Sequence, residues 1–164
     1  MGLEPVAGST HFTFAMIADF AWIRPEPHGI HILPANSWID PARPVERALV
    51  THGHSDHARG GHDATLATTE TLAIMRLRYG TDTGAQPAPN GEPLPLGGGV
   101  QATFLPAGHV LGSAQILLEH AGERVIVTGD YKRRLDPTCP PFVPTPCDIF
   151  VTEATFGLPV FVHP

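Results

Sequence analysis

The sequence lacks any apolar stretch long enough to cross a membrane. None of its hydrophobic runs approaches the roughly 20 residues that a transmembrane helix needs. Its first residues also lack the basic segment followed by an apolar one that marks a secretory signal peptide. We therefore expect a cytoplasmic chain with no membrane partner.

Cysteine is scarce, with two residues among 164. Cys139 and Cys147 lie among prolines and do not form a Cys-x-x-Cys spacing. The pattern therefore predicts free thiols rather than a structural disulfide or a zinc knuckle.

Basic residues are also in the minority. Ten Lys plus Arg stand against sixteen Asp plus Glu, a net charge of −6, so the chain has no overall positive field to attract nucleic acid. Basic groups occur locally at Arg76, Arg78 and the run Lys132-Arg133-Arg134. Lys132 and Arg133 are candidate phosphate contacts, although solvated surface charge is the ordinary role of such a run.

The composition is that of a folded protein, because 42% of the residues are hydrophobic, enough for one domain or a large piece of one. The periodicity predicts mostly strands and one helix, which begins at Thr69, ends near Tyr79 and is stopped by Gly80. Residues 81–99, rich in glycine and proline, are predicted to form a loop. The predicted strands are 30–33, 38–40, 47–51, 66–68, 100–105, 114–119, 124–128 and 148–152.

The most informative segment is residues 51–57, Thr-His-Gly-His-Ser-Asp-His, directly after the apolar run 48–50. In an extended segment, His52 and His54 point to the same side and can bind one ion. Asp56 and His57 lie past the bend and can face a second ion. Imidazole and carboxylate are the ligands that zinc and related divalent metals accept. The segment therefore predicts a two-metal hydrolytic site.

Two further candidate ligands follow later strands. His109 lies in Gly-His-Val-Leu-Gly-Ser after the strand 100–105, and Asp130 lies in Thr-Gly-Asp-Tyr after the strand 124–128. A carboxylate at such a position can bridge two cations roughly 3.5–4 Å apart. All these groups lie just past the carboxyl ends of strands, where active sites of α/β sheets collect.

The order of these motifs resembles the metallo-β-lactamase superfamily, and Thr-Gly-Asp-Tyr-Lys-Arg with Val-Thr-Glu-Ala-Thr-Phe-Gly (151–157) resembles its β-CASP nuclease branch. Within that branch, the segments 43–48 and 156–161 look most like bacterial ligase-associated DNA exonucleases, often labelled messenger-RNA 3′-end processing factors. The resemblance implies the α/β fold known as αββα, of which this chain would be the β-rich N-terminal half with few helices. Residues 1–164 would then be the N-terminal part of the domain, with the β-CASP cap and the C-terminal half outside them.

The resemblance also implies roles for individual residues. One metal would be held by His52, His54 and His109, the second by Asp56 and His57, with Asp130 bridging both. Asp40 would support the site, and Glu153 would steady a proton donor that lies downstream in relatives. The cofactors would be two divalent ions, zinc first and manganese second. In catalysis the acting residues would be Asp56, Asp130 and Glu153.

The function implied is metal-dependent phosphodiester hydrolysis, with DNA as the first expected substrate, RNA as the second, and DNA ligase or helicase as potential associates. Because the cap and the C-terminal half would lie outside residues 1–164, we expect weak or absent catalysis by this chain alone. Two alternatives stay open. The chain could be a non-catalytic or partner-dependent piece, or a small-molecule metallohydrolase of the glyoxalase or lactonase kind, which shares the same six ligands. Gly53, where relatives commonly have alanine, is expected to loosen the ligand-bearing loop.

Overall fold

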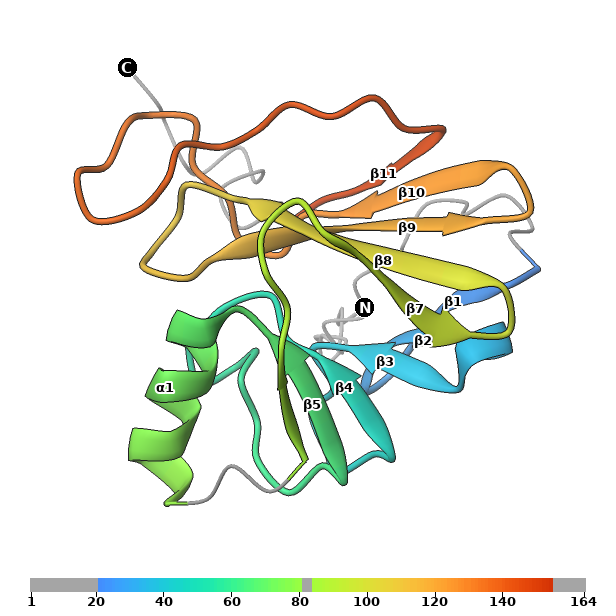
Figure 1. The fold of residues 1–164 in the computed structure, drawn as a ribbon, viewed down its shortest axis with the longest axis horizontal. Coiled ribbons are helices and arrows are strands. Elements are labelled where there is room, and N and C mark those ends of the chain that lie inside the picture. Colours follow the sequence, from blue (N-terminus) through green and yellow to red (C-terminus); the bar gives the residue numbers. More distant parts are fainter. Residues whose placement is uncertain (1–20, 81–83, 155–164) are drawn as a thin grey trace, which may run out of the picture.

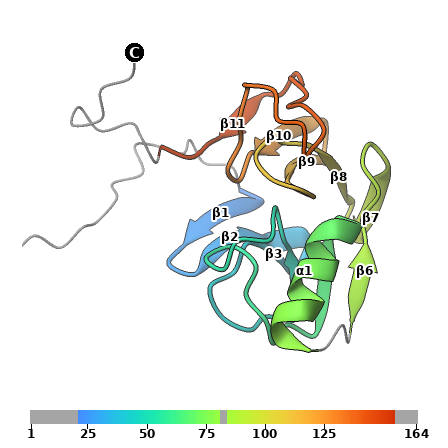
Figure 2. The ribbon, with the colours of Figure 1, turned by 90° about the vertical axis from the view of Figure 1, so that its left-hand side faces the viewer.

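The computed structural model describes residues 21–80 and 84–154. These residues form two β-sheets that face each other, with one α-helix, α1 (Thr69–Tyr79), on the outer side of one sheet (Figure 1). A view turned by 90° shows the same two layers, with α1 beside the lower one (Figure 2). The predicted fold class, β-rich α/β with few helices, is confirmed.

The N-terminal sheet has six strands in the order β1-β2-β3-β4-β5-β6. The first three form an antiparallel meander, and β3 to β6 run parallel to one another. Parallel neighbours need a crossover connection, and α1 provides the one between β5 and β6. The strands are β1 (Ile23–Glu26), β2 (Gly29–Ile32), β3 (Ser37–Ile39), β4 (Arg47–Leu49), β5 (Ala64–Ala67) and β6 (Ala85–Pro87), with a 3-10 turn at Leu33–Ala35.

The C-terminal sheet has five strands in the order β11-β10-β9-β8-β7. Strands β7 to β10 are antiparallel neighbours, whereas β11 runs parallel to β10. Because β8 and β10 both run opposite to β9, the carboxyl ends of β8, β10 and β11 lie at the same edge. The strands are β7 (Pro93–Gly97), β8 (Val100–Pro106), β9 (Ala114–His120), β10 (Glu123–Val127) and β11 (Ile149–Val151).

The main core lies between the two sheets. Its largest fully buried side chains are Ile32, Ile39, Leu49, Val100, Phe104, Ile116, Leu118 and Val125. Each such side chain contributes about 1.5–3 kcal/mol by leaving water, so together they fix the position of one sheet on the other. The edges that carry the polar loops are thereby held together.

A second, smaller core lies under α1. Met75 and Leu72 of the helix pack on Ala48, Val50 and Ala67 of the N-terminal sheet. The helix begins after Thr68, whose hydroxyl accepts a hydrogen bond from the Thr71 amide, and it ends at Gly80 with φ 72°. Both the range and the glycine stop match the prediction from sequence.

The predicted loop at residues 81–99 is wrong, because this stretch contains β6 and β7. Strand β1 was not anticipated either. Part of the motif at 151–157 lies outside the described residues. Within the described ranges no helix is long and apolar enough to span a membrane, and placement in the cytoplasm stays a prediction.

Candidate metal centre

The polar candidates meet at one edge of the paired sheets, each just past the carboxyl end of a strand. Asp40 follows β3 and the residues 52–57 follow β4, while His109, Asp130 and Glu153 follow β8, β10 and β11. The parallel pairing of β3 with β4 and of β10 with β11 makes these loops neighbours. Both sheets therefore contribute to one site.

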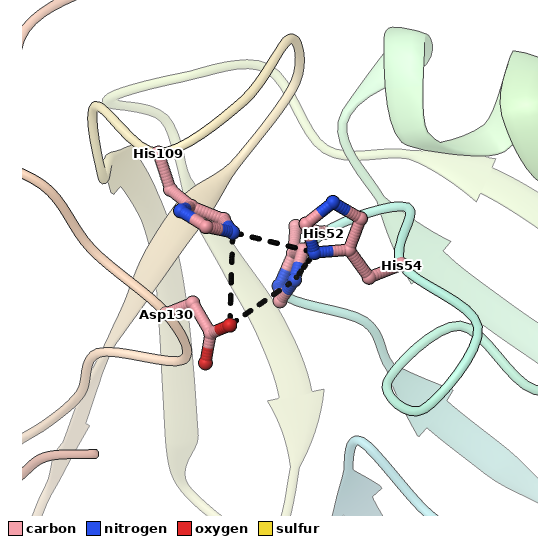
Figure 3. A group of neighbouring side chains, drawn as sticks. All are labelled: His52, His54, His109 and Asp130. Atoms are coloured by element: carbon pink, nitrogen blue, oxygen red, sulfur yellow. Dashed lines mark hydrogen bonds and ion pairs between the residues drawn. The ribbon is translucent and has the colours of Figure 1, made fainter. Parts of the chain in front are cut away.

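Four side chains form a first group: His52, His54, His109 and Asp130 (Figure 3). The His54 Nδ1 atom lies 3.0 Å from His52 Nε2 and 3.3 Å from His109 Nε2. The Asp130 Oδ2 atom lies 3.6 Å from His109 Nε2 and 3.8 Å from His52 Nε2. All four ligand atoms lie within 4.8 Å of one another.

These distances fit a tetrahedral divalent ion. With metal–ligand bonds of about 2.0–2.2 Å, ligand atoms around one ion lie about 3.3–3.6 Å apart. Four of the six pairs in the first group, at 3.0 to 3.8 Å, surround that value, and the other two lie within 4.8 Å. Three imidazole nitrogens and a carboxylate oxygen are donors that a divalent cation accepts, so the residues present fit the metal that the sequence implies.

A second group shares Asp130 with the first. The other carboxylate oxygen, Oδ1, lies 3.5 Å from His57 Nε2, and that nitrogen lies 3.7 Å from Asp56 Oδ2. The Asp56 side chain is 73% exposed, so this group is more open than the first. A pocket of about 300 Å³ adjoins it, lined by Asp56, His57, Asp130, Glu153 and apolar side chains of both sheets. Asp130 is therefore placed between two sets of potential ligands.

Asp40 fixes the orientation of the His57 ring. Its Oδ2 accepts a hydrogen bond from His57 Nδ1 at 2.8 Å, which leaves His57 Nε2 facing Asp130. Asp40 is held in turn by Thr51, whose amide and hydroxyl donate to its two oxygens at 2.8 and 2.6 Å. A carboxylate that fixes the tautomer of a ligand imidazole is typical of the supporting residues of metal sites.

Thr51 also fixes His52. Its hydroxyl proton is given to Asp40, so its oxygen accepts from His52 Nδ1 at 3.1 Å and His52 Nε2 presents a lone pair to the site. His52 is fully buried, and this burial, together with the nearby His57, lowers its pKa to about 3. The imidazole is therefore neutral near pH 7, as a metal ligand must be.

The other titrating groups respond to the same surroundings. Burial opposes the charged form of His57, but the hydrogen bond that it donates to Asp40 and the charges of Asp40 and Asp130 outweigh this and raise its pKa. Burial lowers the pKa of His109, partly offset by Asp130. Burial acts to raise the pKa of Asp56, but backbone hydrogen bonding and the nearby His57, His52 and His54 together outweigh it, so the pKa is lowered.

The remaining candidates lie at the margin of the centre. Glu153 Oε1 accepts a hydrogen bond from the Tyr131 amide at 3.3 Å, next to the candidate ligand Asp130, and its side chain lines the pocket. Lys132 pairs with Asp136 at 2.8 Å, and Arg133 is exposed. The structure therefore places Glu153 near the second group, while Lys132 and Arg133 lie just beyond Tyr131.

Sequence reasoning gave no role to two hydroxyl residues that organise the site. Thr51 links Asp40 to His52, and Ser113 Oγ accepts from the amides of His109 and Val110 at 3.0 and 3.1 Å. Both stand in motifs that the sequence displays, Thr51 directly before the histidine cluster and Ser113 in Gly-Ser after His109. What could have identified them in the sequence is that each lies close to a candidate ligand, since neither would bind the metal itself.

Comparison with known proteins supports the resemblance. The chain is 37% identical over 139 residues to a protein named probable DNA ligase from Opitutus terrae, which covers 84% of this chain and 14% of that protein. It is 29% identical over 174 residues to the endoribonuclease YSH1 of Mycosarcoma maydis, covering 82% of this chain and 19% of that protein. No family model matches the chain. The similarity to ligase-named and endoribonuclease-named proteins confirms the relationship predicted from the motifs.

Among solved structures, a metallo-β-lactamase, MIM-2, aligns with a TM-score of 0.42 at 18% identity, over 52% of this chain and 39% of that one. The chain spans 14% and 19% of the two sequence relatives named above, a small part of each.

Proposed function

We propose that this chain forms the metal-binding part of a nuclease that hydrolyses phosphodiester bonds. The observation that carries the proposal is the position of Asp130, whose two carboxylate oxygens face two different sets of potential ligands. A carboxylate shared in this way is what a two-metal site needs. The sequence similarity to an endoribonuclease and to a ligase-named protein supports nucleic acid as the substrate class.

The ligands divide between the two groups. One ion would be held by His52, His54, His109 and Asp130, and the other by Asp56, His57 and Asp130. Asp40 would keep His57 in its ligating tautomer. We propose zinc for the first position, because three nitrogens and one oxygen at tetrahedral spacing are a common zinc environment, with manganese as the second choice.

Two divalent ions, when bound, would supply an activated water and balance charge on the phosphate. The chain's own residues would orient the substrate and help to supply the proton that the leaving oxygen needs. Glu153 lies beside Asp130 at the pocket wall and would steady a proton donor for the leaving oxygen. Lys132 and Arg133 would contact substrate phosphates from the adjacent loop.

Between the two nucleic acids we propose DNA first, because the similarity to the ligase-named protein covers 84% of this chain at 37% identity. The same similarity supports association with a DNA ligase, and association with a helicase stays a proposal from the resemblance alone. RNA is the second substrate, supported by the endoribonuclease relatives. That residues 1–164 are the N-terminal part of a longer metallo-β-lactamase domain also stays a proposal.

The test is hydrolysis by the metal-loaded chain of end-labelled single-stranded DNA, duplex DNA and RNA, with a thioester and a lactone assayed in parallel. We expect weak cleavage of an oligonucleotide that Asp130→Asn abolishes while the variant keeps its fold. Turnover of the thioester or lactone without oligonucleotide cleavage would contradict the proposal and support a small-molecule hydrolase.

A second candidate is a metal-binding piece that needs further sequence for catalysis. It is favoured by the second group, which offers only three ligand residues among those the structure describes, one of them largely exposed. Bound metal with no turnover of any of these substrates would support it.

A further inference from the structure

The C-terminal end of α1 lies against the loop that carries most of the ligands, residues 52–58, which we name the ligand loop. Within this loop the amides of His57 and Ala58 both donate to the carbonyl of His54, at 3.2 and 2.7 Å, and so form one helical turn. This turn has no regular strand pairing within the described residues. Its shape must therefore be set by what packs against it.

Arg78 holds both ends of this turn. Its Nη2 atom donates to the carbonyl of Gly53 at 2.7 Å and its Nη1 atom to the carbonyl of Ala58 at 3.4 Å. The two carbonyls bracket His54, Asp56 and His57 in the sequence. A planar guanidinium that reaches two acceptors fixes their separation, which the single ammonium of a lysine cannot do.

Two other side chains of α1 close the same contact. The Tyr79 hydroxyl donates to the Ala58 carbonyl at 2.7 Å, and its ring lies so close to Gly60 that a β-carbon there would approach it to 3.0 Å. Ile74, one turn before Arg78, lies under Gly53, where a β-carbon would meet its Cδ1 atom at 2.9 Å. Gly53 is therefore packed against the helix, rather than loosening the loop as the sequence alone predicted.

We propose that Arg78 and Tyr79 are positioning residues for the metal centre, holding the ligand loop so that His54, Asp56 and His57 face the ions. The inference rests on the proposed metal centre and adds residues that bind no metal. Arg78 is therefore more than a local basic group of the sequence, since its guanidinium is engaged with backbone carbonyls. Groups behind the ligands commonly change metal affinity by about 10–100-fold.

The experiment is titration of the metal-free chain with Co²⁺, followed by the visible absorption of the bound ion and then by competition with Zn²⁺. The variants are Arg78→Lys, Arg78→Gln and Tyr79→Phe. The controls are Arg24→Gln, which removes an exposed arginine of β1, and Leu77→Ala, which alters a side chain of α1 that is 90% exposed. Urea unfolding of each metal-free variant measures its stability separately.

We expect Co²⁺ affinity to fall about tenfold in Arg78→Gln, with a changed visible spectrum. Arg78→Lys should change the spectrum as well, because lysine keeps the charge but cannot donate to both carbonyls as the planar guanidinium does. Tyr79→Phe should show a smaller loss, and the two controls none. Unchanged affinity and spectrum in the Arg78 variants, or losses that only follow the urea midpoint, would overturn the inference alone. Absence of Co²⁺ binding by the unmodified chain would instead overturn the metal centre itself.

Discussion

The orientation of single side chains in the centre is set by the residues that are hydrogen-bonded to them. Thr51 is the clearest case, because its one hydroxyl donates to Asp40 and accepts from His52, and so fixes two groups of the site. Asp40 itself has a left-handed backbone, φ 45°, which is unusual for a residue other than glycine and aims its carboxylate at Thr51 and His57. The rings of His52 and His57 are therefore oriented by hydrogen bonds within the protein itself.

The buried His52 makes the stability of the metal-free chain depend on pH. Its pKa in the folded protein is lowered from 6.5 to about 3. Between these two pH values the unfolded chain therefore binds a proton that the folded chain does not bind. Stability should therefore fall as the pH drops from 6.5 toward 3, with a slope of up to about 1.4 kcal/mol per pH unit from this group. Urea unfolding at several pH values in the presence of a chelator measures it.

The matched comparison for this slope is His52→Gln against His54→Gln, since His54 is exposed and His52 is buried. His52→Gln should flatten the pH dependence below pH 6, whereas His54→Gln should leave most of it. Equal slopes in the two variants would show that burial of His52 is not its source.

Gly129, the residue before Asp130, should tolerate no side chain. Its φ is 54°, and a β-carbon there would lie 2.5 Å from Thr51 Oγ1. Gly129→Ala should cost about 1–2 kcal/mol for the left-handed backbone, plus about 1–3 kcal/mol for the overpacking. Gly91→Ala is the control, because Gly91 has φ 80° and nothing within 4 Å, so only the first cost applies. Equal losses in urea unfolding would contradict the predicted contact with Thr51.

Most of the candidate site could be predicted from the sequence, because ligand chemistry is carried by residue type and spacing. His52, His54, His57, His109 and Asp130 all reach the centre that their motifs indicated. The residues that set their geometry could not be found this way. Arg78 and Tyr79 act through backbone carbonyls, and such contacts depend on how α1 packs on the ligand loop rather than on a motif.

At the scale of elements, the strands that the sequence failed to reveal have two features in common. They are β1, β6 and β7, and each is an edge strand of its sheet that contains proline. Proline cannot donate to a sheet ladder, so it is tolerated mainly at edges, where one side of the strand needs no partner. The same prolines that made 81–99 look like a loop are therefore compatible with its pairing in the fold.

The start of α1 is coupled to the loop that carries His109. The Thr68 hydroxyl caps the helix and donates to the carbonyl of Gly112 at 2.7 Å. Thr68→Ala should cost about 0.5–2 kcal/mol of stability, because it removes the cap and leaves Gly112 with one donor fewer. Thr68→Ser keeps the hydroxyl and should cost less than half as much. Urea unfolding compares them, and equal losses would assign the effect to the lost methyl group instead.

At the scale of the whole molecule, the candidate centre joins the two sheets. His52, His54, Asp56 and His57 come from the N-terminal sheet, whereas His109 and Asp130 come from the C-terminal sheet. An ion bound between them would connect layers that are otherwise held by the apolar core. Because a ligand that binds only the folded state stabilises it by mass action, metal binding should raise the free energy of unfolding.

Metal removal should therefore destabilise the chain as a whole. At a free Zn²⁺ concentration about 100 times the dissociation constant, binding contributes about 2.7 kcal/mol, which chelation should remove. Thermal unfolding with Zn²⁺ and with excess chelator measures the difference. Asp130→Ala should show little dependence on Zn²⁺, and a Zn²⁺ effect of the same size in that variant would place the stabilising metal elsewhere.

The central claim is that one carboxylate, Asp130, organises two metal positions at the edge where the sheets meet. Native mass spectrometry of the purified chain, loaded with Zn²⁺ and freed of excess metal, measures the number of ions per chain directly. The account predicts two ions in the unmodified protein and their loss in Asp130→Ala. No bound ion in the unmodified protein, or an unchanged number in the variant, would contradict it.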